Sequence, residues 1–214
     1  WRARGVPANC SASRQKLGIV ALLYFIQGAP AAILWEVLPV YFRINGVSLR
    51  AIGGLRLLEL PYSLKVLWSP LVHRFGDRRP WVTSCMLAIA AVLFVLPFVN
   101  VAGVGLMVLV LILALTTLSA TQDIAIDSYS VGLVARDEEG AANGVRASAY
   151  RVALVLVGGG LVFLAAVLVW NSLFILAGSL FALLGVAALA IPRLELPDEA
   201  RTHWWQGFAG WAGT

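Results

Sequence analysis

Two aspartates, Asp123 and Asp127, lie four residues apart in the stretch SATQDIAIDSYS (residues 119–130), which is set among Val, Leu, Ile and Ala. Residues four apart share one face of an α-helix, so both carboxylates are predicted to project in the same direction. A carboxylate in apolar surroundings is costly, and it can stay neutral and exchange a proton. Two such carboxylates can also hold Mg²⁺ through their oxygen atoms. The pair therefore predicts either proton transfer or metal-dependent chemistry.

Four other polar residues interrupt apolar stretches and are candidates to act with the two aspartates. An ionisable or strongly polar group in such a stretch is expensive to bury, so each one needs a partner and is a functional candidate by default. These candidates are Gln27, Glu59, Lys65 and Arg151.

The composition decides which elements must position these side chains. Of the 214 residues, 60% are hydrophobic and only 13% are charged, and the mean hydropathy is +0.86, outside the range of soluble globular proteins. A helix needs about 20 mainly apolar residues to span a bilayer, and the apolar windows do not alternate as barrel strands would. We therefore predict an all-α membrane protein with six transmembrane helices, near residues 17–42, 50–72, 80–99, 104–133, 143–169 and 171–191.

Basic residues are concentrated on one side of the predicted bundle. They occur in the N-terminal tail, in HRFGDRRP, around RDEEGAAN and after the last window, whereas the connections around Asn100 and Asn171 hold none. Short loops rich in Lys and Arg stay on the cytoplasmic side, so both termini are predicted to be cytoplasmic. The same bias explains the net charge of +5, and no nucleic-acid partner is expected.

The predicted topology assigns depths to the buried charges. The fourth and fifth windows form a hairpin centred near Glu139, and Asp127 and Arg151 are each twelve residues from that centre. At 1.5 Å per residue they lie at the same depth, which makes them the natural ion pair. Lys65 reaches a similar layer. Asp123 is one turn deeper with fewer obvious partners, so it is the stronger candidate for proton coupling.

Structural interpretations of these residues stay open beside the functional ones. Asp127 and Arg151 could only join two helices, or Asp127 could meet Arg74 or Arg78 near the inner interface.

The same holds for the remaining candidates. Glu59 could be neutralised by Arg56, three residues earlier, instead of facing a cavity. Gln27 could mark only a helix kink beside Gly28 and Pro30. The glycines at 158–160 are predicted to let helices approach closely.

Three longer stretches resemble one family of membrane proteins. They are the segment from LYFIQGAP to GDRRPWV, the segment ATQDIAIDSYSVGLV and the segment GAANGVRASAYRVALVLVGGG. Together they resemble the first half of a major facilitator superfamily transporter, in the branch of AmpG-type muropeptide permeases, acetyl-CoA transporters and siderophore importers. The specific combination is TQDIAID with PYSLK upstream and NG followed by YR downstream.

This resemblance covers most of residues 17–192 and half of a twelve-helix transporter. It implies two six-helix halves that rock about a central site, secondary active transport by alternating access, and proton coupling. It also implies that Gln27, Asp123 and Asp127 face the pathway, with Lys65 and Arg151 nearby. The basic groups favour a small anionic or zwitterionic solute of the muropeptide, siderophore or acyl-CoA type, and the expected location is the bacterial inner membrane.

The chain is expected to be one half of such a transporter. It begins without Met and ends soon after IPRLELPDEA, which resembles the start of a central linker. We expect a cytoplasmic tail (1–16), a six-helix domain (17–191) and the start of a cytoplasmic linker (192–214). The expected partners are the lipid bilayer, the solute, protons and a missing C-terminal six-helix half.

Two other functions stay open. Intramembrane metal-dependent transferases use aspartate pairs like Asp123 and Asp127, but they place further acids nearby, and Arg151 suits an ion pair better than a metal site. A non-transporting membrane scaffold is the second alternative. The sequence favours a transporter over an enzyme, and no metal or cofactor is expected.

Overall fold

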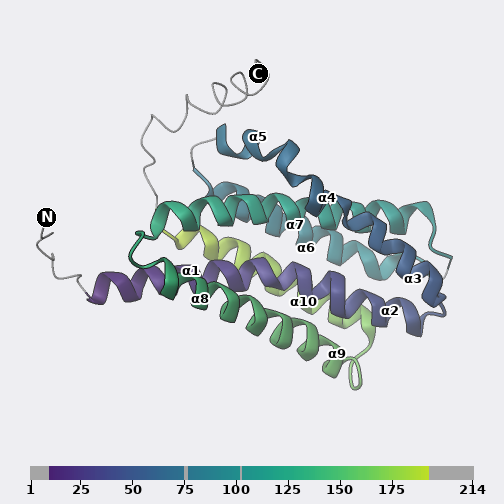
Figure 1. Ribbon diagram of the computed structural model, residues 1–214. Helices are drawn as coiled ribbons and strands as arrows, with labels where there is room; N and C mark the ends of the chain where they lie inside the picture. The colour runs from purple at the N-terminus through teal and green to yellow at the C-terminus, as the bar shows by residue number, and fades with distance from the viewer. Residues whose placement is uncertain (1–9, 75–76, 102, 193–214) are drawn as a thin grey trace, which may run out of the picture.

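The computed structural model describes residues 10–74, 77–101 and 103–192. All regular structure in these residues is helical, as predicted, and the long helices lie side by side along one axis (Figure 1). The predicted N-terminal tail up to residue 9 and the predicted linker from residue 193 lie outside the described residues. The long helices are α1 (Cys10–Ala32), α6 (Arg79–Val95), α7 (Leu106–Leu133), α8 (Glu139–Ala153) and α10 (Trp170–Ala187).

Shorter helical segments extend or connect these helices. A π-helical turn, η1, carries α1 into α2, and a second π-helical turn, η5, carries α8 into α9. Short 3₁₀ turns, η4 and η6, end α6 and α10. Their bounds are η1 (Ile33–Val37), α2 (Leu38–Ile44), η4 (Leu96–Phe98), η5 (Leu154–Gly159), α9 (Gly160–Leu164) and η6 (Ala188–Ala190).

Five of the six predicted membrane spans are confirmed as helices long and apolar enough to cross a bilayer. The first is longer than the hydrocarbon core is thick, so it must tilt or extend past the interface. The five candidate spans in the described residues are Ser13–Ile44, Arg79–Phe98, Leu106–Leu133, Glu139–Leu164 and Trp170–Ala190.

The span predicted near residues 50–72 is helical, and its interruption beside Pro61 agrees with the bend expected at a proline, but it is divided into more segments than one bend would give. Proline lacks a backbone N–H and clashes with the preceding helical turn, and Pro61 follows directly on a 3₁₀ turn that leads into α4. A second 3₁₀ turn begins at Lys65, which places this residue at a break in the helical path. The segments are α3 (Leu49–Leu55), η2 (Arg56–Glu59), α4 (Leu60–Leu64), η3 (Lys65–Leu67) and α5 (Ser69–Arg74), and Figure 1 shows them following one path along α7.

Small residues set the distance between α1 and the helix formed by α8 and η5. A Cβ atom at Gly28 would lie 2.8 Å from the Ala153 Cβ atom and 2.9 Å from the Tyr150 carbonyl oxygen. A Cβ atom at Gly158 would lie 2.9 Å from the Glu36 Cγ atom. The packing role predicted for residues 158–160 is therefore confirmed for the first glycine, whereas the other two have open space.

Helix α1 lies between α7 and α8 (Figure 1). Helix α8 packs mainly on α1, and α1 in turn packs on α7. On the other side of the molecule, α6 packs against α10, where Met86, Phe174 and Phe181 are fully or almost fully buried.

We predict that Gly28→Ala destabilises the bundle by about 1–3 kcal/mol, because a methyl group there overlaps the backbone and side chain of α8. The matched control is Gly18→Ala on the same helix, where a Cβ atom meets nothing within 4 Å. That control should be neutral or slightly stabilising, since alanine is the better helix former. The midpoint of thermal unfolding in detergent measures both. Equal shifts for the two variants would contradict the role of Gly28.

Candidate functional site

Lys65 lies between the two aspartates of α7. Its ammonium group contacts the Asp123 carboxylate directly and lies 3.9 Å from the Asp127 Oδ2 atom. The helical period of α7 points both carboxylates in the same direction, and the break at η3 brings the lysine opposite them. One cation therefore interacts with two carboxylates.

Helix α1 contributes one polar side chain to each aspartate. The Gln27 amide donates to the Asp123 carboxylate. The Tyr24 hydroxyl donates to the Asp127 Oδ1 atom over 2.7 Å. Tyr24 and Gln27 are three residues apart and share a face of α1, and they meet the two aspartates in the reverse order, as antiparallel helices require. The structure thus brings Gln27, Asp123, Asp127 and Lys65 into one cluster.

The polar stripe of α7 continues beyond the aspartates in both directions. The Ser119 Oγ atom lies 2.6 Å from the Tyr62 hydroxyl oxygen. At the other end, the Ser130 Oγ atom accepts hydrogen bonds from two guanidinium nitrogens of Arg146, over 3.0 and 2.7 Å. Both serines are buried, so the stripe faces the bundle, as the sequence predicts.

The predicted ion pair between Asp127 and Arg151 is wrong. The partners of Asp127 are Tyr24 and Lys65, whereas Arg151 is exposed and forms no ion pair with any described residue. The error lies in the assumed symmetry of the hairpin, because α7 ends six residues after Asp127 and α8 begins twelve residues before Arg151. At 1.5 Å per residue, this difference of six residues places Arg151 roughly 9 Å deeper in the bundle than Asp127.

The prediction that Asp123 is the less compensated acid is also wrong. Its side chain is 13% exposed and contacts both Lys65 and Gln27, whereas that of Asp127 is 45% exposed and has no cation closer than 3.9 Å. The alternative that Asp127 meets Arg78 is not borne out by the hydrogen bonds either, since the Arg78 guanidinium donates to Ser128.

Glu59 lies apart from this cluster. Its carboxylate is 3.8 Å from the Arg56 guanidinium, which confirms the local neutralisation that their spacing of three residues allows. Both residues line a separate cavity of about 140 Å³ beside Trp35. Glu59 therefore does not contribute to the charges around Lys65 in this structure.

Two residues of the cluster were missed in the sequence, Tyr24 and Arg146. Tyr24 could have been found from its position three residues before Gln27 on an apolar helix. The Arg146 guanidinium lies over the Tyr24 ring, 5.6 Å from its centroid, and also donates to Asn143. It forms no ion pair within 4.0 Å of either aspartate.

A second group of polar contacts joins the start of α1 to the connection between α7 and α8, which lies outside the candidate spans. The Glu138 carboxylate accepts a hydrogen bond from the Ser13 side chain and a backbone hydrogen bond from Ala135, and it forms an ion pair with Lys16 at 3.5 Å. These contacts, of which that with Ser13 is the strongest, hold the pKa of Glu138 below its usual range.

We predict that this junction loosens in acid. Because the pKa of Glu138 is lowered in the folded state, its contribution to stability is present above the ordinary value of 4.5 and is lost as the pH falls through the folded value. Hydrogen-exchange protection factors for residues 134–138 should fall in that range and should not depend on pH in Glu138→Gln. A similar pH profile in both proteins would contradict the assignment.

We also predict different energetic couplings for Lys65 and Arg151. Removing one partner of a shielded ion pair strands the other, so Lys65→Met and Asp123→Asn should each destabilise the protein and the double variant should lose less than the sum. The expected coupling in a thermal-unfolding cycle is about 1–3 kcal/mol. The cycle of Asp127→Asn with Arg151→Gln should be additive within about 0.5 kcal/mol. Strong coupling between Asp127 and Arg151, with none between Lys65 and Asp123, would contradict the partners assigned to the two aspartates.

Comparison with known proteins places the chain among membrane transporters. It is 29% identical over 185 residues to the anhydromuropeptide permease of Escherichia coli K12, covering 82% of this chain and 37% of the relative. It is 27% identical over 190 residues to the putative transporter AmpG 4 of Rickettsia felis, covering 84% and 46%. An uncharacterized protein of Haemophilus influenzae is 32% identical over 173 residues, covering 75% and 39%.

The chain spans less than half the length of these curated relatives. A family model described as the Major Facilitator Superfamily matches residues 16–213, which is nearly the whole chain. The all-helical fold and the five helices able to cross a bilayer agree with this match. The chain is therefore an integral membrane protein of the major facilitator superfamily, and it resembles the AmpG branch.

Proposed function

We propose that the protein acts in proton-coupled secondary transport of a small anionic or zwitterionic solute by alternating access, with this chain supplying one half of the transporter. The observation that carries the proposal is the single lysine shared by two carboxylates on α7. Polar and charged groups inside a membrane bundle mark solute and proton pathways.

The proton stoichiometry follows from the charges of the cluster. Asp123 and Asp127 supply two negative charges and Lys65 supplies one positive charge, so the cluster lacks one positive charge when both acids are ionised. Uptake of one proton makes it neutral.

Asp127 is the acid on which we place that proton in this conformation. Its nearest cation is 3.9 Å away and its side chain is 45% exposed, so a proton can reach it from water. Lys65 and Asp123 then remain together as a neutral pair. Closing the transporter around a neutral cluster costs less free energy than closing it around a charged one. Proton binding is thereby coupled to the change of access.

The other charged groups around Asp127 fit this assignment. From α1, Tyr24 donates a hydrogen bond to the carboxylate. From α8, Arg146 is held by Ser130 and Asn143. Lys65 is the cation that the structure places within 4.0 Å of either aspartate, among the residues described.

We further propose that the segments α3 to α5 form the sixth crossing of the membrane, with both chain termini on the cytoplasmic side. Support comes from their position along α7 in Figure 1 and from the bias of basic residues toward one side of the bundle. Broken helices occur at membrane depth where they border a cavity, and the break at Lys65 lies beside the aspartates.

An anhydromuropeptide is the solute class that we propose, in the bacterial inner membrane. The support is the name of the Escherichia coli relative, which is a permease for such compounds, and the bacterial origin of the relatives cited above. An unpaired cation, Arg151, also favours a solute with negative charge.

A metal-dependent transferase is less well supported. A Mg²⁺ ion bound by Asp123 and Asp127 needs the space between the two carboxylates, and the Lys65 ammonium lies there. The described residues also contain no group of three or more His, Cys, Asp or Glu side chains that could hold a metal ion.

We predict that Asp123→Asn and Asp127→Asn each abolish uptake driven by a proton gradient while solute exchange without a gradient continues. Either change leaves one carboxylate with one lysine, a neutral cluster that needs no proton. The protein expressed from its complete gene should be reconstituted in vesicles, and uptake of an anhydromuropeptide should be measured with and without acid outside.

The control for this prediction is the double variant Lys65→Met with Asp127→Asn. It holds one carboxylate and no lysine, so it again needs one proton for neutrality, and some dependence on the proton gradient should return. Gradient-driven uptake that survives in both single variants would contradict the proposed coupling.

A further inference from the structure

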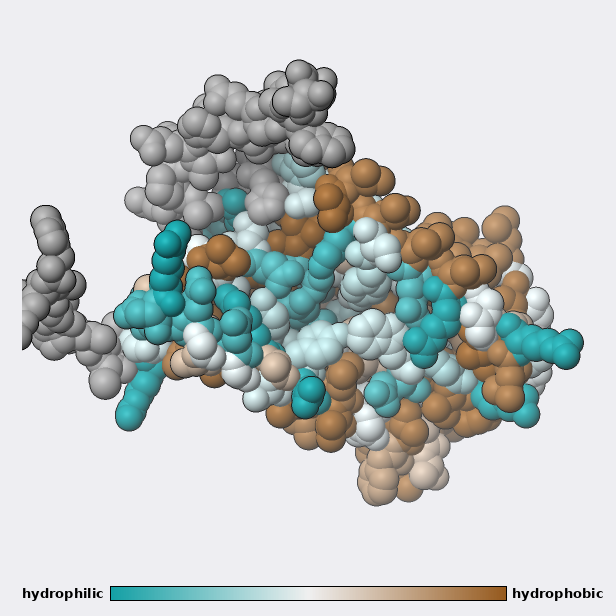
Figure 2. Space-filling model, viewed as in Figure 1, coloured by the Kyte–Doolittle hydropathy of each residue, from teal (hydrophilic) through white to brown (hydrophobic). Residues whose placement is uncertain are grey.

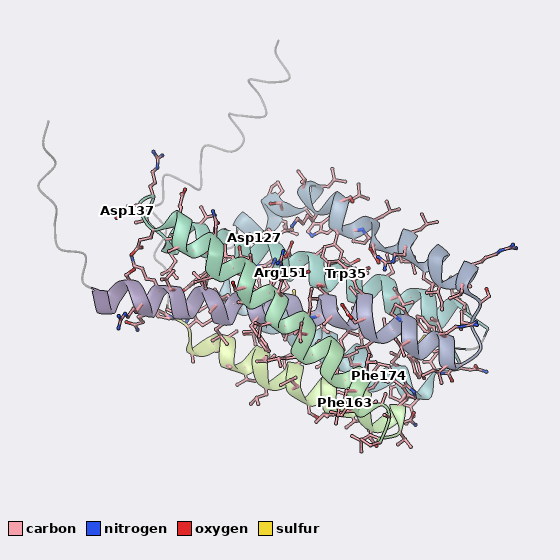
Figure 3. The ribbon with its side chains drawn as sticks, turned by 60° about the horizontal axis from the view of Figure 1, so that its bottom comes forward. Trp35, Asp127, Asp137, Arg151, Phe163 and Phe174 are labelled. Atoms are coloured by element: carbon pink, nitrogen blue, oxygen red, sulfur yellow. The ribbon has the colours of Figure 1, made fainter. Side chains whose placement is uncertain are left out.

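Arg151 differs from the other basic residues in its layer of the bundle. The Lys65 ammonium is held by the aspartates, and the Arg146 guanidinium is held by Ser130 and Asn143. Arg151 is exposed and makes no hydrogen bond or ion pair with any residue that the structure describes. Figure 3 shows it midway between Asp137, which precedes α8, and Phe163 in α9, on the continuous helical path of α8, η5 and α9. A full positive charge thus lies in the middle of a membrane span without a protein partner.

The depth of Arg151 follows from the contact between α8 and α1. Tyr150 and Ala153, on either side of it, are the residues that approach Gly28. Gly28 follows Gln27, whose amide donates to Asp123. Arg151 is therefore near the level of Asp123, the deeper of the two acids, and deeper than Asp127.

The face of α8 that carries Arg151 contains more small and polar residues than a surface that faces lipid. Ala153 of α8 packs on α1. At about 100° per residue, Tyr150 lies next to Ala153 around the helix, and Arg151 lies further round, away from α1. In the part of α8 before Arg151, the exposed residues on this side are small or polar, whereas Val155, one turn further on, is an exposed hydrophobic residue, and Val145, Val152 and Leu156 lie together on another side. The small and polar residues are Gly140, Asn143, Gly144, Ala147 and Ser148.

The surface of the molecule agrees with this division. Figure 2 shows hydrophilic and near-neutral residues in a band along the molecule, bordered by hydrophobic residues above and below. The band overlies the region where α1 lies between α7 and α8 in Figure 1. A charge on the lipid side at mid-span is expensive, so Arg151 is accommodated where water or a solute reaches it.

We propose that Arg151 binds an oxyanion of the transported solute, which in an anhydromuropeptide is a carboxylate. This inference rests on the proposed function. The guanidinium group offers parallel N–H donors that match the two oxygens of a carboxylate, and the resulting charge-assisted pair is stronger than a neutral hydrogen bond. In this proposal the two basic residues have different roles: Lys65 compensates the aspartates that bind the proton, and Arg151 binds the solute.

Binding measurements on the complete protein in detergent test this division. The probes are an anhydromuropeptide and its derivative with every carboxylate converted to a carboxamide. Arg151→Gln should weaken binding of the acid roughly 10- to 100-fold and leave binding of the amide unchanged, the range expected for losing charge-assisted hydrogen bonds. Arg151→Lys should recover part of the loss, since lysine keeps the charge but not the planar fork.

The matched control is Arg50→Gln, which removes an exposed arginine of α3 without a described partner. An equal loss for both probes in Arg151→Gln, or the same loss in Arg50→Gln, would overturn the role of Arg151. Wild-type protein that binds the acid without gradient-driven uptake would contradict the proposed function, while the ratio of the two Kd values would still decide the role of Arg151. Failure of the wild type to bind either probe would overturn both.

Discussion

The shared lysine is the contact on which the functional arrangement depends. Two carboxylates on one face of α7 are costly in an apolar bundle, and Lys65 compensates one of them fully and the other in part. Placing the ammonium there requires the break in the helical path at η3, and keeping both acids hydrogen-bonded requires Tyr24 and Gln27 of α1. The position of Lys65 at η3 and the polar face of α1 together satisfy this electrostatic constraint.

Close helix packing keeps these groups in register. Gly28 lets α8 approach α1 so closely that a single methyl group would overlap it, and the same contact sets the depth of Arg151. Asp127 keeps 45% of its side chain exposed although the neighbouring Ser130 is buried and bonded to Arg146 of α8, and Figure 2 shows a hydrophilic band on this face. Packing by small residues thus keeps the Lys65 cluster close to the exposed guanidinium of Arg151, the groups to which we assign the proton and the solute.

Much of this arrangement could be predicted from the sequence, because hydrophobic windows and helical spacing determine spans and faces. Five spans and the inward stripe of α7 follow from such patterns, whereas the association of Gln27 with the aspartates is implied by the family resemblance. The pairing of Asp127 with Arg151 could not be judged correctly, because counting residues from a loop ignores where each helix ends. A bend of the second window at Pro61 could be predicted, because proline disrupts a helix, whereas the second break at Lys65 could not be predicted from residue spacing alone.

The central claim is that one cation shared by two carboxylates makes the cluster bind a single proton. Infrared difference spectroscopy between acidic and neutral pH, with aspartate labelled by ¹³C, detects protonated carboxyl groups directly. The wild type should show a protonated aspartate band that disappears in both Asp123→Asn and Asp127→Asn, because each variant is neutral without a proton. A band that persists unchanged in both variants would contradict the account.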